Sequence, residues 1–203
     1  ITISSQRILK AMELPDEKFR KIVEDSLNII LQELDSIKKL AEEFGNFARL
    51  PEIKFSKGDI NQLLEKLISV YTSIYSNIDF IVNLDVEIPI MVKMDVEQMK
   101  RIFVNIIDNA VESLGEQGTI EVVSRYNQES QFIRIEIADD GPGISDEDKE
   151  KLFIPYFSHK NSGKSGTGLG LAITHNIIEE HNGLISVVDN TPRGARFIIE
   201  IPA

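Results

Sequence analysis

The chain has 203 residues, 42% of them hydrophobic, which is enough for one ordinary domain plus a smaller element. Its 33 acidic residues outnumber its 22 basic ones, and the formal net charge of −11 opposes binding to nucleic acid or anionic membrane over most of the surface. The absence of cysteine excludes disulfides and thiolate metal sites, the three histidines lack zinc-ligand spacing, and no apolar run of about 18 residues predicts a membrane span.

The first fifty residues have the pattern of two helices. Apolar residues recur at helical spacing up to Met12, and Leu14-Pro15-Asp16 predicts a turn. From residue 17 to 50, apolar side chains follow one another at alternating steps of four and three, which is a heptad seam. Its members are Val23, Leu27, Ile30, Leu34, Ile37, Ala41, Phe44 and Ala48. Additional apolar residues widen the seam, which favours a four-helix bundle; because one chain supplies two helices, we expect a homodimer.

Pro51 marks a change to alternating helices and strands, so we expect a helical dimerisation unit over residues 1–50 and a second domain over 51–203. In the second domain the sequence predicts helices at 60–75, 96–114, 146–152 and 169–181, and strands at 80–84, 90–93, 119–126, 132–138, 184–188 and 196–201. The polar residues 127–130 predict a hairpin turn. We therefore expect an α+β fold, with helices on one face of a mixed sheet.

Two asparagines lie one turn apart in the helix expected at 96–114. Asn105 and Asn109 stand at i and i+4, so their amides project from the same face. Asparagine is a poor residue for the middle of a helix, because its amide competes with the backbone for hydrogen bonds. A solvated pair is one interpretation, and a ligand that both amides contact is the other.

The segment Asp139-Asp140-Gly141-Pro142-Gly143 directly follows the strand expected at 132–138. A carboxylate fixed at the end of a strand can accept a hydrogen bond from the exocyclic amine of a base, and the glycines let the backbone pass close to a ligand. The same residues are also typical of an ordinary turn.

Alternating glycines precede the helix expected at 169–181. A glycine-rich segment at a helix N-terminus presents unpaired N–H groups and the positive end of the helix dipole to a phosphate. Residues 163–171 do not follow the Walker pattern, because no Gly-Lys-Ser/Thr closes them, and no strand directly precedes them as in a Rossmann fold. A flexible loop is the alternative interpretation.

The order of these motifs resembles that of sensor histidine kinases. The set is Asn-x-x-x-Asn-Ala on a helix, Asp-x-Gly-x-Gly after a strand, residues 152–160, Gly-Thr-Gly-Leu-Gly-Leu at 166–171, and Gly194 before the last strand. It resembles the N, G1, F, G2 and G3 boxes of these kinases, whose ATP-binding domain belongs to a wider family with gyrase, Hsp90 and MutL. Residues 1–8 and 42–51 also resemble the helices of NtrY-type nitrogen-regulation sensor kinases.

The resemblance implies a site for ATP and Mg²⁺. Asn109 would bind the Mg²⁺ that bridges the phosphates, and Asn105 would assist the metal or the phosphates. Asp139 would accept a hydrogen bond from the adenine amine, while Gly141 and Gly143 would pass under the base. The residues that would wrap the phosphates are Gly166, Thr167, Gly168, Leu169 and Gly170.

The resemblance also implies a mobile lid over residues 153–165, from which Lys160 or Lys164 would reach the γ-phosphate. The chain departs from the family at Glu112, where many relatives carry a basic residue.

Position 105 separates the members of this family by chemistry. ATPases of the gyrase and Hsp90 kind carry a glutamate there, which can deprotonate water, whereas the amide of Asn105 cannot. The γ-phosphoryl group would then be transferred to a protein nucleophile. In sensor kinases this is a histidine within His-Glu-x-x-x-Pro, and none of His159, His175 and His181 begins such a motif. We therefore expect the acceptor to precede Ile1, and the fragment to be unable to phosphorylate itself.

The implied function is that of a protein-histidine kinase core of a two-component system, which passes the γ-phosphoryl group of ATP to a histidine and then to an aspartate. The expected partners are a second copy of the chain and the receiver domain of a response regulator, with no nucleic acid. The implied location is the cytoplasmic side of an inner-membrane protein that is anchored through upstream segments. The alternatives are a family ATPase or serine kinase, and a dimeric scaffold without nucleotide.

Overall fold

The computed structural model describes residues 2–11, 16–48, 53–85, 91–157 and 168–203. These residues belong to two compact units. The first is formed by helices α1 (Thr2–Ala11) and α2 (Asp16–Ala48), and the second by the elements from β1 onward.

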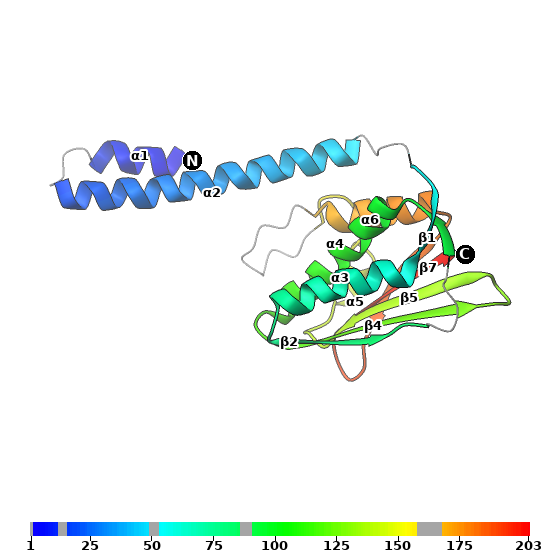
Figure 1. Ribbon diagram of the computed structural model, residues 1–203. Coiled ribbons are helices and arrows are strands. Elements are labelled where there is room, and N and C mark those ends of the chain that lie inside the picture. Colours follow the sequence, from blue (N-terminus) through cyan, green and yellow to red (C-terminus); the bar gives the residue numbers. More distant parts are fainter. Residues whose placement is uncertain (1, 12–15, 49–52, 86–90, 158–167) are drawn as a thin grey trace. The chain divides into compact units, whose positions relative to one another are not determined.

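Helices α1 and α2 lie side by side as a hairpin, in agreement with the two helices predicted for this region (Figure 1). Ser4 of α1 and Ser26 of α2 are buried in this unit. By contrast, the seam residues Leu27, Leu34 and Ile37 are 47%, 49% and 52% exposed. These seam positions are therefore about half exposed in this unit. The side chains of the last three seam residues, 41, 44 and 48, lie outside the described part of the chain.

The second unit is built on a five-stranded mixed sheet with the order β2-β4-β5-β7-β6. Its strands are β2 (Ile78–Asn83), β4 (Gly118–Asn127), β5 (Phe132–Asp139), β6 (Leu184–Asp189) and β7 (Ala195–Pro202). Strand β2 pairs with β4 in parallel, and every other neighbouring pair is antiparallel. The β4–β5 register, in which Asn127 pairs with Phe132, confirms the predicted hairpin.

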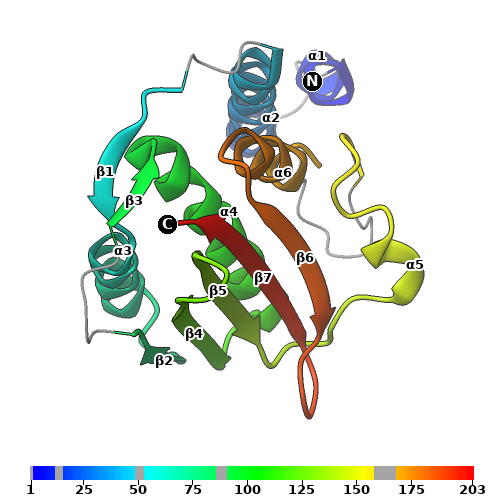
Figure 2. The same cartoon turned by 90° about the vertical axis from the view of Figure 1, so that its right-hand side faces the viewer.

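A separate two-stranded sheet pairs β1 (Ser56–Asp59) with β3 (Met91–Met94), and Figure 2 shows the two side by side. The sequence predicted β3 but not β1. The residues Ser-Lys-Gly-Asp have little intrinsic preference for a strand, so β1 owes its conformation to pairing with β3. Prediction from local pattern has no access to such a partner.

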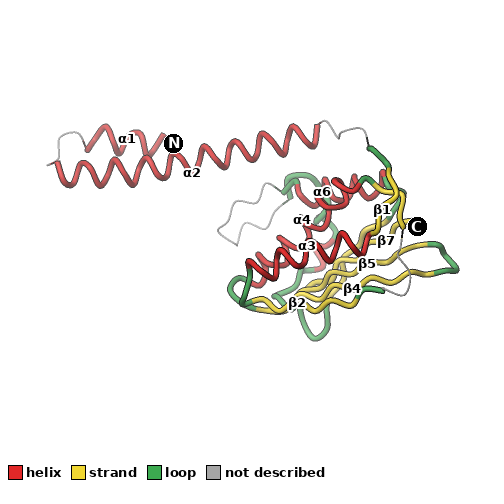
Figure 3. The backbone as a smooth tube through the Cα atoms, in the orientation of Figure 1, coloured by secondary structure: helices red, strands yellow, loops and turns green. Residues whose placement is uncertain are grey.

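Helices α3 (Ile60–Ile74), α4 (Val96–Leu114) and α6 (Gly170–Glu180) form a layer on one face of the five-stranded sheet, as Figure 3 shows. Aspartates begin two of them: the Asp59 carboxylate accepts from the backbone N–H groups of the first turn of α3, and Asp95 does the same for α4. The short helix α5 (Asp146–Lys149) ends three residues before its predicted end. There the chain turns more tightly, because the N–H of Ile154 donates to the carbonyl oxygen of Lys151 at 2.9 Å.

The core lies between this helix layer and the sheet. Side chains alternate across a strand, so Ile133, Ile135 and Ile137 of β5 are buried toward the helices, while Arg134 and Glu136 lie on the opposite face. Burying one such side chain stabilises the fold by about 1.5–3 kcal/mol. The fully buried residues of α4 that meet this surface are Met99, Ile102, Phe103, Ile106 and Ile107. This apolar stripe fixes the rotation of α4 about its axis, and with it the direction of the polar face.

Candidate functional site

Three polar residues follow one line along α4: Asn105, Asn109 and Ser113 are each one i, i+4 step apart. With a rise of about 1.5 Å per residue, the line is about 12 Å long. At one end, Nδ2 of Asn105 donates to the carbonyl oxygen of Gly170 at 3.1 Å and to Oγ1 of Thr174 at 3.2 Å. In the middle, the half-buried Asn109 side chain makes no hydrogen bond to another residue in the described part of the chain.

The other end of the line is at Asp139, the last residue of β5. Its side chain is only 4% exposed, and Oδ1 accepts from the backbone N–H groups of Gly141 at 2.9 Å and Ala195 at 3.4 Å. Burial raises the pKa of Asp139, and hydrogen bonds from Gly141, Ala195 and the Ser113 side chain only partly oppose that rise. The carboxylate is therefore a buried acceptor whose two backbone donors both use one of its oxygens.

Glycines pack around Asp139, where there is no room for side chains. A Cβ added to Gly141 would lie 2.7 Å from Oδ1 of Asp139 and 2.7 Å from Oγ of Ser113. Gly194 has a φ of +106°, and a Cβ there would lie 1.8 Å from the carbonyl oxygen of Asp139. Gly143, with a φ of +81°, packs on the carbonyl of Gly194, where a Cβ would be 3.2 Å from the oxygen. The backbone thus forms a close-fitting cradle beside Asp139.

The glycine segment before α6 is described from Gly168 onward. Gly168 has a φ of +68°, and its carbonyl oxygen accepts from the N–H of Tyr156 at 2.9 Å. Leu169 is fully buried and occupies the N-cap position of α6 without a side-chain cap, so no side chain of its own covers the N–H groups of the first turn. The predicted phosphate ligands Gly166 and Thr167, and the predicted lid residues Lys160 and Lys164, lie outside the described residues.

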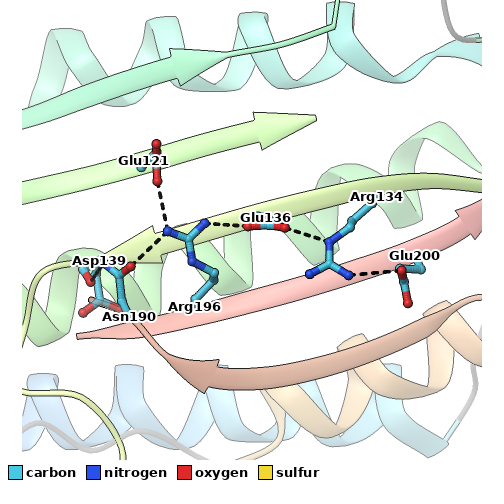
Figure 4. A network of polar contacts seen from close by, with 7 residues as sticks. All are labelled: Glu121, Arg134, Glu136, Asp139, Asn190, Arg196 and Glu200. Carbon is cyan, nitrogen blue, oxygen red and sulfur yellow. Dashed lines mark hydrogen bonds and ion pairs between the residues drawn. The ribbon is translucent and has the colours of Figure 1, made fainter. Parts of the chain in front are cut away.

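A network of ion pairs lies on the face of the sheet opposite the helices and reaches Asp139 through Asn190 (Figure 4). Asn190 donates through Nδ2 to the carbonyl oxygen of Asp139 at 2.9 Å, and its Oδ1 accepts from Arg196 at 2.9 Å. Arg196 of β7 also donates to Glu136 on the adjacent strand β5 and to Glu121 on the next strand, β4. Burial acts to raise the pKa of Glu136, but hydrogen bonds from Arg134 and Arg196 to its carboxylate lower the pKa overall.

Two histidines of the second unit, His181 and His175, contact neighbouring residues of the fold. His181 is 5% exposed: its Nδ1 lies 2.7 Å from the carbonyl oxygen of Ile177, and its Nε2 accepts from the N–H of Asp95 at 3.0 Å. His175 lies against Phe153, with ring centroids 5.5 Å apart. Both ring nitrogens of His181 are therefore engaged with the backbone. His159 lies outside the described residues.

The chemistry of the site suits a polar ligand with an amine at one end and anionic oxygens at the other. A buried carboxylate meets the first requirement, and the N–H groups that begin α6, where the N-cap residue supplies no side-chain hydrogen bond, meet the second. Among the described residues, no group of three or more histidine, aspartate and glutamate side chains could hold a metal ion.

Residues 94–203 match the family described as "Histidine kinase-, DNA gyrase B-, and HSP90-like ATPase". The chain belongs to this family. It is 35% identical over 184 residues to the signal transduction histidine-protein kinase AtoS of Escherichia coli, which covers 89% of this chain and 29% of AtoS. It is 30% identical over 197 residues to a putative NtrY-like sensor histidine kinase of Rickettsia bellii, covering 96% of this chain and 31% of the relative.

A structural comparison agrees with the sequence relatives. The crystal structure of histidine kinase ThkA in complex with the response regulator protein TrrA matches with a TM-score of 0.75 and 30% identity, over 99% of this chain and 57% of that one. The second unit is thus a histidine kinase ATP-binding domain, which confirms the family inferred from the motifs and the predicted mixed sheet with helices on one face. The chain spans 29% and 31% of the lengths of AtoS and the NtrY-like relative.

Sequence reasoning missed several residues of this site. Ser113 continues the i, i+4 spacing of the asparagines and could have been found by extending it one step. Thr174 and Asn190 carry no such signal, because their contacts with Asn105 and Asp139 join elements distant in sequence.

In the described parts of the chain, no helix has both the length and the apolarity needed to cross a membrane.

Proposed function

We propose that this chain is the ATP-binding kinase core of a two-component sensor histidine kinase. The observation that carries the proposal is the polar line on α4, which runs from the buried carboxylate of Asp139 to the start of α6. One face of one helix thus joins an acceptor for a base to a set of donors for phosphates. Its length of about 12 Å suits a nucleotide in an extended conformation.

In this proposal the base lies beside Asp139. Because Oδ1 already accepts two backbone hydrogen bonds, Oδ2 is the oxygen that would accept from the adenine amine. Gly141 and Gly143 would pass under the base, and an added Cβ at Gly141 would lie 2.7 Å from Oδ1 of Asp139. The phosphates would lie at the start of α6, on Gly168, Leu169 and Gly170. The remaining phosphate ligands of the proposal are Gly166, Thr167 and Lys160.

Asn109 and Asn105 are the proposed ligands of Mg²⁺. Their amide oxygens fit the ion, because Mg²⁺ prefers hard oxygen donors, keeps several waters and binds nucleotides together with substrate phosphates rather than in an all-protein cage. The ion would supply neutralisation of the phosphate charge. Asn109 makes no competing side-chain hydrogen bond to another described residue, while Asn105 has only its oxygen left because its nitrogen donates to α6.

Phosphoryl transfer in this proposal goes to a histidine and not to water. Asn105 cannot act as a base, and its nitrogen is already held by two oxygen acceptors. No histidine of the chain begins a His-Glu-x-x-x-Pro motif, so we propose that the acceptor is not among these 203 residues. An aspartate of a response regulator would receive the group next. The ThkA complex with TrrA supports docking of such a regulator.

The domain roles complete the proposal: residues 1–50 pair with a second copy as the dimerisation unit, and residues 51–203 form the catalytic unit. The exposed seam residues Leu27, Leu34 and Ile37 support pairing, since they would become buried in a four-helix bundle. In the whole protein, upstream segments would anchor this cytoplasmic core to the inner membrane.

Calorimetric titration with ADP, with and without Mg²⁺, tests the nucleotide site, and γ-labelled ATP tests the transfer. We expect micromolar binding that Mg²⁺ strengthens, together with no label on the chain alone. Steady release of phosphate, or label on a serine, would favour the ATPase or serine kinase. Absence of binding would favour a scaffold without nucleotide.

A further inference from the structure

We propose that Thr174 is a positioning residue for the phosphate end of the nucleotide site, and that it acts through Asn105 by holding the first turn of α6. This inference rests on the proposed function, because it assigns a role in that same site to a residue with no motif of its own. Thr174 is fully buried, and its Oγ1 accepts a hydrogen bond from Nδ2 of Asn105 at 3.2 Å.

The geometry at Asn105 is that of a two-point latch. A side-chain amide nitrogen has two hydrogens, and the two acceptors of Asn105, the carbonyl oxygen of Gly170 and Oγ1 of Thr174, stand one helical turn apart on α6. One amide thus spans the first turn of α6 and ties it to α4. With both hydrogens used, the amide oxygen is the atom that remains for a ligand, so the latch also sets which way the amide of Asn105 faces.

The latch matters for the first turn of α6, because the N-cap residue does not hold this turn through its side chain. Leu169 at the N-cap position makes no side-chain cap hydrogen bond. The donors proposed to hold phosphates are the N–H groups of this turn, and their direction follows that of the helix end. A latch between α4 and α6 therefore keeps those N–H groups at a fixed position relative to Asn109 on the same face of α4.

The test is Thr174→Val, which keeps the β-branched shape and removes the hydroxyl. One amide hydrogen of Asn105 then loses its acceptor in a buried place. We expect Mg·ADP affinity to fall about three- to tenfold, while affinity for adenosine, measured by displacement titration, stays within twofold of that of the unchanged chain. A loss confined to the phosphate-bearing ligand distinguishes positioning from general loosening of the fold, which would weaken both ligands equally.

Two further variants serve as controls. Thr174→Ser keeps the hydroxyl and should restore the affinity for Mg·ADP. Thr72→Val removes a helical threonine hydroxyl that donates only to the carbonyl oxygen of Ile68 in its own helix, and it should leave both affinities unchanged.

A double-mutant cycle with Asn105→Ala tests whether the two residues act through one contact. We expect the double variant with Thr174→Val to bind Mg·ADP no more weakly than Asn105→Ala alone. Additive losses, unchanged Mg·ADP affinity in Thr174→Val, or equal weakening of ADP and adenosine would overturn the inference while leaving the proposed function in place. Failure of the unchanged chain to bind ADP at all would contradict the proposed function itself.

Discussion

Replacement of Asp139 by asparagine should separate nucleotide binding from stability. Asparagine keeps a side-chain oxygen, so the N–H groups of Gly141 and Ala195 retain their acceptor. Its NH₂ group then takes the place of Oδ2 and faces the adenine amine, which pairs a donor with a donor. Alanine is a poorer choice, because it would also leave those two backbone donors without a partner.

The expected loss of affinity follows from the contact removed. A hydrogen bond to a charged group contributes about 1.5–3 kcal/mol, so ADP should bind Asp139→Asn about tenfold to hundredfold more weakly. Isothermal titration in the presence of Mg²⁺ measures this loss. Asp140→Asn is the matched control: the same substitution one residue further along, at a carboxylate whose Oδ1 accepts from the N–H of Thr119 at 2.8 Å, should leave ADP affinity within twofold.

The same substitution, Asp139→Asn, should weaken ADP binding but increase the stability of the fold at neutral pH. Burial raises the pKa of Asp139 above its ordinary value of 3.8, so ionisation costs the folded state more than the unfolded state. That cost is absent below pH 3.8 and complete once the pH exceeds the folded-state pKa. Relative to the unchanged chain, Asp139→Asn should therefore gain stability toward urea as the pH rises from acid to neutral. ADP binding within twofold of the unchanged chain would refute this reasoning, as would a stability relative to the unchanged chain that falls as the pH rises from acid to neutral.

Other predictions concern the glycine segment, the ion-pair network and the helical seam. Gly168→Ala should lower the free energy of unfolding, measured by urea titration, by about 2 kcal/mol or more. The reason is that Gly168 has a positive φ and that an added Cβ would lie 2.6 Å from a backbone carbon. Gly170→Ala, whose added Cβ meets only ordinary contacts, should cost less than half as much. Arg196→Met should destabilise the chain by about 1–3 kcal/mol at neutral pH. The destabilisation should become smaller as the pH falls through the lowered pKa of Glu136, because the carboxylate that Arg196 stabilises then becomes protonated. An equal loss at every pH would contradict this assignment. Leu34→Asp should convert a dimer to a monomer in light scattering, since it places a charge in the proposed bundle, and a chain already monomeric at high concentration would contradict the pairing.

Hydrophobic periodicity was sufficient to predict most elements of this fold. Helices α3, α4 and α6 and the β4–β5 hairpin have strong local patterns, and their observed ends differ from the predicted ones by one residue or none. Strand β1 could not be predicted, because its conformation depends on pairing with β3. The parallel pairing of β2 with β4 is likewise a property of the assembled sheet and leaves no trace in either strand alone.

The site divides in the same way. Asn105, Asp139 and the glycines stand out because each is unfavourable or unusual for its local structure, and the structure brings Asn105 to Gly170. Besides its predicted role as a ligand, Asn105 has a structural role, because its side-chain nitrogen donates to Thr174 of α6. Thr174, buried in a helix, looks like an ordinary core residue until its partner on α4 is known. Tertiary contacts of this kind have no signature in sequence spacing.

The most direct measurement is a crystal structure of the chain with ADP and Mg²⁺. The account predicts the adenine amine within hydrogen-bonding distance of Asp139 and the phosphates at the N–H groups that begin α6, with the ion on Asn109. A nucleotide bound elsewhere, or a site that stays empty at saturating ADP, would contradict it.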